Sequence, residues 1–273
     1  GPLAEARRHL LDTRRTRDQP LTDDKIIVGW NGLMIAGLAD AGRVLDEPRY
    51  VSAAERAAGW IRSRMWTPER GLMRTARDED VKIEAFLEDY AMLVRGLVAL
   101  SEATADPAWL AWAESLVEQA RRDFWDEERG GWYDTRADQS DLLVRGRSLY
   151  DGAIPSGSGS MLLNLVRLRD LGQRRWDEDI RAALAAASWT IDRAPASTAA
   201  STRALVRLLR DHPELVAHDG VPEATVKAGR VTLTVSPASR SLPAGTTAKI
   251  MLQVTIEPGW HVGTPGQDNP FAI

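Results

Sequence analysis

The stretch "FLEDYAMLVRGLVALSEATADPAWLAWAESLVEQARRDF", residues 86–124, decides the fold class. Apolar residues recur every three or four positions through 87–104 and again through 107–124, which is the periodicity of two amphipathic helices. The connection "TADPAW" between them is short and contains a proline, which favours the start of a new helix. The stretch therefore predicts an antiparallel helical hairpin.

The same plan recurs on both sides of this hairpin. Helical patterns at 32–45 and 49–65 predict a preceding pair, those at 158–171 and 175–193 predict a following pair, and single helices are expected at 3–17 and 197–211. Two of the long loops also open alike, with "WTPERGLMRT" from Trp66 and "WDEERGGWYDT" from Trp125, which align with one inserted glycine. This internal repeat of roughly 60 residues is typical of an array of helical units.

Helical hairpins in series either curl into an (α/α) toroid or stack as a solenoid. The loops between the hairpins span about 20–30 residues, and loops of that length favour the toroid because solenoid turns are usually short. We therefore expect a mainly α chain in which residues 1–215 form part of an (α/α)₆ toroid. Asn31, Asp89 and Ser158 align in one column and are expected to be N-caps of the more apolar, inner helices.

The pattern of apolar and polar residues changes after Val221 and Pro222. The run "RVTLTVSPASRSLPAGTTAKIMLQVTIEPGWHV" alternates apolar and polar residues and is rich in Val, Thr and Ile, which predicts two or three antiparallel strands. We expect a linker at 216–228 and a small β segment at 229–273 that ends without a closing strand. The chain opens inside a helix without methionine, so the native N-terminus is expected to lie upstream.

Composition excludes several function classes. The net charge is -4, with 35 Lys+Arg against 39 Asp+Glu, so we expect no nucleic-acid or membrane partner. The chain has no cysteine, which excludes a disulfide, a thiolate zinc site and a CxxC redox centre. No apolar run approaches the ~18–20 residues that span a bilayer, and no leader opens the chain. We therefore expect a soluble, cytoplasmic protein with no metal and no cofactor.

Three blocks carry a family resemblance: "DDKIIVGWNGLMIAGLADAGR", "FLEDYAMLVRGLVALSEAT" and "DGAIPSGSGSMLLNLVRL". In this order they resemble the C-terminal half of the thioredoxin domain-containing family that includes spermatogenesis-associated protein 20 and bacterial YyaL. The resemblance implies a six-hairpin glycosidase-like toroid, related in shape to N-acylglucosamine 2-epimerases, and a thioredoxin-like domain as partner in the full-length protein. On this resemblance, we expect that domain and the first half of the toroid to lie outside this chain.

Two further points follow from the resemblance. The tail "AKIMLQVTIEPGWHVGTPGQDNPFAI" resembles the start of the immunoglobulin-like N-terminal domain of the thiol:disulfide interchange protein DsbD, which implies a truncated immunoglobulin-like segment. Ser158 stands where the family usually has asparagine, so a ligand contact through that amide is in question. The related epimerases use histidines as acid–base groups, but His9, His212, His218 and His261 all lie outside the inter-hairpin loops. A similar epimerase is not expected from this chain alone.

The approach to the first inner helix, "DDKIIVGWN", contains four candidate site residues. Asp24 is a candidate acid–base group, and Lys25, Trp30 and Asn31 are candidates for substrate binding, with Trp30 as a stacking platform for a sugar ring. The alternative is a local ion pair between Asp24 and Lys25, a tryptophan in the core and a capping asparagine. The residues alone leave both interpretations open.

The next two inner helices repeat the pattern. Glu88, Asp89 and Asp151 are candidate catalytic carboxylates, and Tyr90 and Ser158 are candidates for substrate binding. A capping position predicts a lowered pKa for Asp89, which makes Glu88 the better general acid. Two carboxylates that face each other at roughly 5–9 Å would suit glycoside chemistry. The alternatives are a capping Asp89 with a buried Tyr90, and a turn role for Asp151.

These observations leave three functional hypotheses. The leading one is a toroid that binds or processes a carbohydrate, with carboxylates as the catalytic groups if it is an enzyme. The first alternative is a non-catalytic scaffold associated with thiol redox chemistry or protein quality control, and the second is a truncated, inactive fragment. Half a toroid also exposes apolar edges, through which we expect self-association.

Overall fold

The computed structural model describes residues 1–139, 142–216, 224–228, 230–237 and 250–257. The chain divides into two compact units, Gly1–His212 and Pro213–Ile273. Within the described residues, no helix has the length and apolar character needed to cross a membrane.

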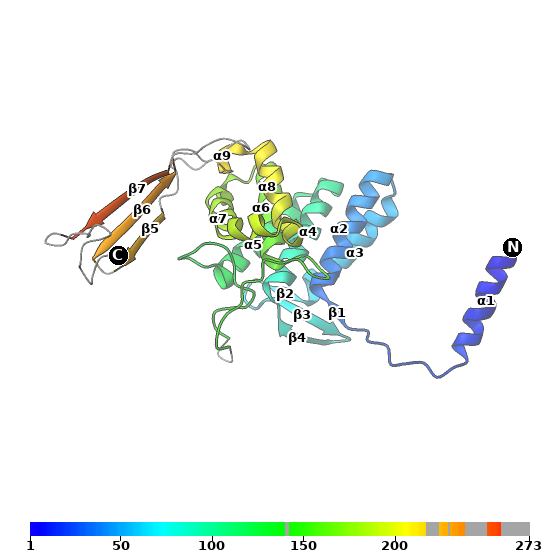
Figure 1. The fold of residues 1–273 in the computed structure, drawn as a ribbon. Coiled ribbons are helices and arrows are strands. Elements are labelled where there is room, and N and C mark those ends of the chain that lie inside the picture. The colour runs from blue at the N-terminus through cyan, green and yellow to red at the C-terminus, as the bar shows by residue number, and fades with distance from the viewer. Residues whose placement is uncertain (140–141, 217–223, 229, 238–249, 258–273) are drawn as a thin grey trace. The chain divides into compact units, whose positions relative to one another are not determined.

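The first unit is built of helical hairpins, as the apolar periodicity predicts (Figure 1). The first hairpin pairs α2 (Val28–Leu45) with α3 (Pro48–Arg64), and the second pairs α4 (Leu87–Thr104) with α5 (Pro107–Phe124). The third pairs α6 (Gly157–Asp170) with α7 (Asp177–Arg193). The single helices are α1 at Pro2–Arg15, in which no residue is buried, and α8 at Ala199–Asp211. The hairpin prediction is therefore confirmed, although α2 begins four residues earlier than expected.

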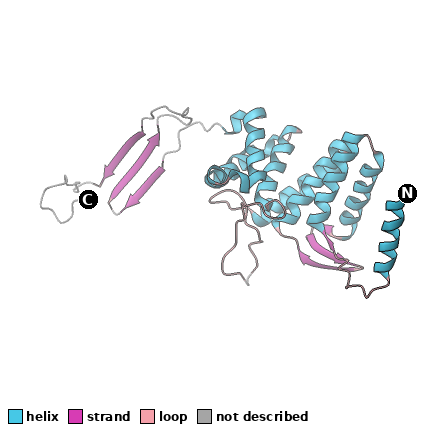
Figure 2. Cartoon of the chain, turned by 45° about the vertical axis from the view of Figure 1, so that its right-hand side comes forward, coloured by secondary structure: helices cyan, strands magenta, loops and turns pink. Residues whose placement is uncertain are grey.

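The helices α2, α4, α6 and α8 lie side by side and run parallel, as an inner layer (Figures 1 and 2). Glycines set their spacing. A Cβ on Gly32 of α2 would lie 2.5 Å from the backbone of Met92 in α4, and one on Gly96 would lie 2.7 Å from the carbonyl oxygen of Gly32. The next pair of inner helices is also close at a glycine, because Gly157 of α6 contacts the first turn of α4 at Glu88. The helix backbones are therefore in direct contact.

The expectation that Asn31, Asp89 and Ser158 are N-caps is wrong. The residues that precede the inner helices are Ile27, Phe86 and Ser156. Asn31 lies inside the first turns of α2, where its Nδ2 donates to the carbonyl oxygen of Ile27 at 2.9 Å. Ser156 is the residue that caps α6, because its Oγ accepts from the N–H of Gly159 at 3.2 Å. Asp89 is the third residue of α4 and accepts backward, from the N–H of Phe86 at 3.0 Å.

A small sheet precedes α4 where the sequence predicted only a loop. β3 at Gly71–Arg77 pairs antiparallel with β1 at Ile26–Ile27, β2 at Trp66–Thr67 and β4 at Asp80–Glu84. The loop repeat is confirmed in its geometry, because Trp66 pairs with Leu72 and Trp125 pairs with Trp132. The second turn is one residue longer, which is the inserted glycine.

The second unit contains the short helix α9 at Pro213–Val216 and an antiparallel sheet in the order β5-β6-β7. The strands cover Ala224–Ala228, Val231–Pro237 and Ile250–Ile256. The antiparallel β segment is therefore confirmed, and its first strand lies in the stretch expected to be a linker. Most of the DsbD-like tail, including His261, lies outside the described residues.

Candidate functional site

The first turns of α4 and α6 meet at one end of the inner layer, and this contact forms the floor of a cavity. A Cβ on Gly157 would lie 3.0 Å from the backbone nitrogen of Glu88, so a larger residue would push the two helix starts apart by a few tenths of an ångström. The cavity has a volume of about 310 Å³ and ten lining residues: Phe86, Glu88, Asp134, Thr135, Ser148, Tyr150, Ile154, Pro155, Ser156 and Gly157. We call it the mouth cavity.

Arg74 of β3 joins two of the predicted carboxylates. One of its Nη atoms lies 2.8 Å from Glu88 Oε1 and 2.6 Å from Asp89 Oδ2, and its guanidinium group also lies over the Phe86 ring at 5.0 Å. The side chain of Glu88 is 36% exposed and that of Asp89 is 1% exposed. Glu88 therefore reaches the cavity, while Asp89 lies beneath it as a buried anchor for the sheet.

The pKa of Asp89 is raised to about 6, where its helix position alone predicts a lowered value. Burial of the carboxylate is the largest cause, and it outweighs the charge of Arg74 and the hydrogen bond from the Phe86 N–H. Loss of hydration disfavours the charged form, and near the floor of a packed helix layer this effect exceeds that of the helix N-terminus. The expectation of a lowered pKa is therefore wrong.

The second carboxylate of the cavity, Asp134, comes from the long loop after α5. Its oxygens accept from the backbone N–H of Ser148 at 3.0 Å and from the Ser148 hydroxyl at 2.7 Å. The Leu87 N–H donates to the Asp134 carbonyl oxygen at 3.1 Å, so the loop is also tied to the start of α4. These bonds hold the Asp134 carboxylate in one orientation at the wall of the cavity.

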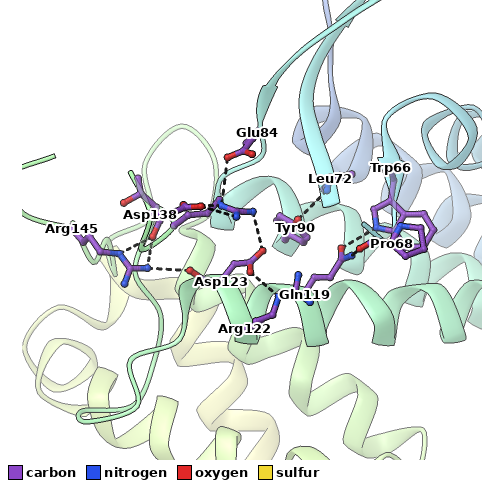
Figure 3. A network of polar contacts seen from close by, with 12 residues as sticks. Trp66, Pro68, Leu72, Glu84, Tyr90, Gln119, Arg122, Asp123, Asp138 and Arg145 are labelled. Atoms are coloured by element: carbon purple, nitrogen blue, oxygen red, sulfur yellow. Dashed lines mark hydrogen bonds and ion pairs between the residues drawn. The ribbon is translucent and has the colours of Figure 1, made fainter. Parts of the chain in front are cut away.

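A polar network fixes the loop that carries Asp134 (Figure 3). Arg136 pairs with Asp123 at the end of α5 at 3.2 Å, with Asp138 at 3.0 Å and with Glu84 of β4 at 3.5 Å. Arg145 donates to the carbonyl oxygens of Asp123 and Thr135 in the same network. The loop is therefore fastened both to α5 and to the sheet, which positions one wall of the cavity.

The four candidates near α2 do not line the mouth cavity. Asp24 pairs with Arg77 of β3 at 2.5 Å, and Lys25 pairs with Asp23 at 3.2 Å, so the local pair expected between Asp24 and Lys25 does not form. Trp30 is 60% exposed rather than part of the core. Asn31 bonds within its own helix. Their roles in binding remain predictions.

Tyr90, Asp151 and Ser158 have backbone partners. The Tyr90 hydroxyl accepts from the Leu72 N–H at 3.0 Å, and the residue is only 2% exposed. Asp151 accepts from the N–H groups of Ser156 at 2.9 Å and Ala200 at 2.8 Å, and thereby joins the starts of α6 and α8. Ser158 is buried near the carbonyl oxygen of Trp132, at 3.5 Å. Each of these groups therefore connects two elements at the mouth end.

Sequence reasoning missed Arg74, Asp134, Ser148 and Tyr150. Arg74 lies in the repeated loop motif, where the alternation of "GLMRTAR" and "VKIE" is the available signal for a strand pair with one polar face. Asp134, Ser148 and Tyr150 come from irregular backbone, which has no periodicity to reveal a direction. Among the described residues, no group of acids and histidines has the arrangement of a metal site.

Solved structures share the fold of the first unit. Solved structures similar to this chain include a cellobiose 2-epimerase from Bacillus thermoamylovorans, with a TM-score of 0.52 and 14% identity over 75% of this chain and 64% of that one. They also include an α-mannanase of glycoside hydrolase family 76 from Bacteroides thetaiotaomicron. Its TM-score is 0.50, with 16% identity over 63% of this chain and 47% of that one. The first unit is thus part of a six-hairpin glycosidase-like (α/α)₆ toroid.

Sequence relatives narrow the assignment. The chain is 34% identical to human spermatogenesis-associated protein 20 over 207 residues, which is 72% of this chain and 26% of that protein. The rat protein is 34% identical over 224 residues, or 75% of this chain and 28% of that protein. No protein-family model matches the chain. The chain belongs to the family of spermatogenesis-associated protein 20, and it spans about a quarter of the length of these curated relatives.

Proposed function

We propose that the mouth cavity binds a carbohydrate or a similar polyhydroxylated ligand. The observation that carries this proposal is the lining of one cavity of about 310 Å³ by two carboxylates, Glu88 and Asp134, and two aromatic rings, Phe86 and Tyr150. Carboxylates accept hydrogen bonds from sugar hydroxyls, and aromatic rings pack against the apolar faces of sugar rings. A pocket of this size with a few convergent polar groups suits a small ligand.

Within this proposal Glu88 is the acid–base candidate. Its carboxylate reaches the cavity and has Arg74 on one oxygen. Asp134 is held by Ser148 and serves as the second carboxylate. Asp89 and Asp151 act as positioning residues, because their oxygens accept from backbone N–H groups at helix starts. Asp24, Lys25, Trp30 and Asn31 stand at the neighbouring helix start, where a longer ligand would extend.

The fold also supports this class of ligand. The similar structures are named as a cellobiose 2-epimerase and an α-mannanase, both of which act on carbohydrates. Their identity to this chain is low, so the likeness supports the scaffold, and the lining of the cavity supports the ligand class.

The test is titration of the chain with cellobiose and with α-1,6-mannobiose, followed by ligand-observed NMR and calorimetry. We expect millimolar binding that is weakened by Glu88→Gln and by Asp134→Asn. Glu128→Gln is the matched control, because Glu128 is an exposed carboxylate on the same loop that does not line the cavity. Equal weakening by the control, or binding untouched by both cavity variants, would overturn the proposal.

One observation favours a second candidate, the non-catalytic scaffold. Arg74 pairs with both Glu88 and Asp89, and a purely structural anchor between sheet and helix would make the same contacts. In that case the toroid would be a partner of a thioredoxin-like domain in a longer protein. Absence of sugar binding in a full-length relative, together with loss of stability in Arg74→Met, would favour the scaffold.

A further inference from the structure

A second cavity lies along the inner helices, toward the C-terminal halves of α2, α4 and α6. Its volume is about 300 Å³, and it is lined by five arginines that come from four helices: Arg43, Arg95, Arg167, Arg203 and Arg207. Only two acids, Asp40 and Glu102, line it with them. We call it the arginine cavity.

Two of the five arginines already have acidic partners. Arg167 pairs with Glu102 at 2.7 Å, and Arg207 pairs with Asp170 at 2.5 Å. Arg43, Arg95 and Arg203 make no hydrogen bond or ion pair within the described part of the chain, and Asp40 is the acid left to face them. The cavity therefore holds three cationic groups against one carboxylate.

Arg95 is the least exposed of these three. Burial lowers its pKa, the nearby charges of Arg203 and Arg167 lower it further, and Asp40 counteracts them. A half-buried guanidinium group with two like charges beside it is unfavourable unless a counter-charge is present. No protein group within the described residues fills that role completely.

The donors of the cavity match one kind of ligand. The amide of Asn164 is already used, because its Nδ2 donates to the carbonyl oxygen of Ala91 at 2.7 Å. The remaining donors are guanidinium groups, whose planar fork of N–H groups fits the oxygens of a phosphate or phosphate ester. Three of them from separate helices surround a volume that holds such a group with room to spare.

We propose that the arginine cavity is a binding site for a phosphate-type oxyanion, either free or as the phosphate of a small-molecule ester. The anion would lie among Arg43, Arg95 and Arg203 and supply the counter-charge that the protein lacks there. This site shares no lining residue with the mouth cavity, so the proposal is independent of carbohydrate binding.

The test is titration of the chain with inorganic phosphate at low ionic strength, by calorimetry and by thermal unfolding. We expect saturable binding and a rise of the unfolding midpoint, with affinity about tenfold weaker in the double variant Arg95→Gln, Arg203→Gln. Arg181→Gln is the matched control, because this arginine pairs with Glu178 on the outer helix α7 and its loss changes the net charge in the same way as each single substitution. Sodium chloride of equal ionic strength controls for screening.

The variants also report on folding. Removing like charges should leave the unfolding midpoint without phosphate equal to that of the wild type or higher, so a loss of binding is separable from a loss of structure. Arg203→Gln alone removes an exposed side chain and serves if the double variant does not fold. A phosphate effect equal to that of sodium chloride, or equal weakening by Arg181→Gln, would overturn the proposal.

Discussion

Gly32 and Gly37 lie on the same helix, α2, and provide a sharp test of how the inner layer packs. A Cβ on Gly32 would lie 2.5 Å from backbone atoms of Met92 and Leu93, whereas one on Gly37 would meet nothing within 4 Å. To restore an ordinary contact of 3.4 Å, α2 and α4 would have to separate by nearly 1 Å at this point. Backbone atoms cannot rotate away as a side chain can, so the clash can be relieved only by moving the helices apart.

The two substitutions should change the free energy of unfolding in opposite directions. Gly37→Ala should stabilise the first unit by up to about 1 kcal/mol, because alanine favours a helix interior. Gly32→Ala gains the same propensity but overpacks the interface, for a net loss of roughly 1–3 kcal/mol. The assay is urea unfolding followed by circular dichroism, with both variants at one protein concentration. Equal midpoints for the two variants would refute the backbone contact between α2 and α4.

Three further outcomes are expected. Tyr90→Phe should cost about 1–3 kcal/mol in urea unfolding because it leaves the buried Leu72 N–H without its acceptor, whereas Tyr50→Phe, which alters an exposed hydroxyl, should cost little. Because the pKa of Asp89 is raised from 3.8 to about 6, its contribution to stability is complete below pH 3.8 and is lost as the pH rises through 6. The stability difference between wild type and Asp89→Asn should therefore shift by about 2 kcal/mol between pH 4 and pH 7 against the wild type, and parallel pH profiles would contradict this. Self-association through α2 should weaken on Trp30→Ser, which removes a side chain 60% exposed, but not on Trp189→Ser on α7, at 63% exposed, as measured by sedimentation.

The hairpins could be predicted because each helix has one apolar face and a proline or turn at its boundary. The limits of α4 and α5 agree with the expected 87–104 and 107–124, since Asp106 caps α5 and proline opens it. The start of α2 could not be predicted in the same way. Ile27 is extended because it pairs with β3, and that partner lies far along the sequence.

The prediction that Asn31, Asp89 and Ser158 are N-caps was wrong for a related physical reason. Asparagine, aspartate and serine favour helix starts, but their side chains here reach backward or across to neighbouring elements. Glu88 was identified from its position beside Asp89, whereas Arg74 and Asp134 depend on how the sheet and the loop fold onto α4. The arginine cavity gathers side chains from four helices, and no local pattern signals such a cluster.

The glycine contacts between inner helices also have a consequence for ligand recognition. Where bulky side chains separate two helices, rotamer changes can alter the spacing, but Gly32, Gly96 and Gly157 leave backbone against backbone. The floor of the mouth cavity is thus preorganised, and a ligand would lose little affinity to the ordering of its site. Substitutions in the irregular loop that carries Asp134 should then alter selectivity, while the helix starts keep their geometry.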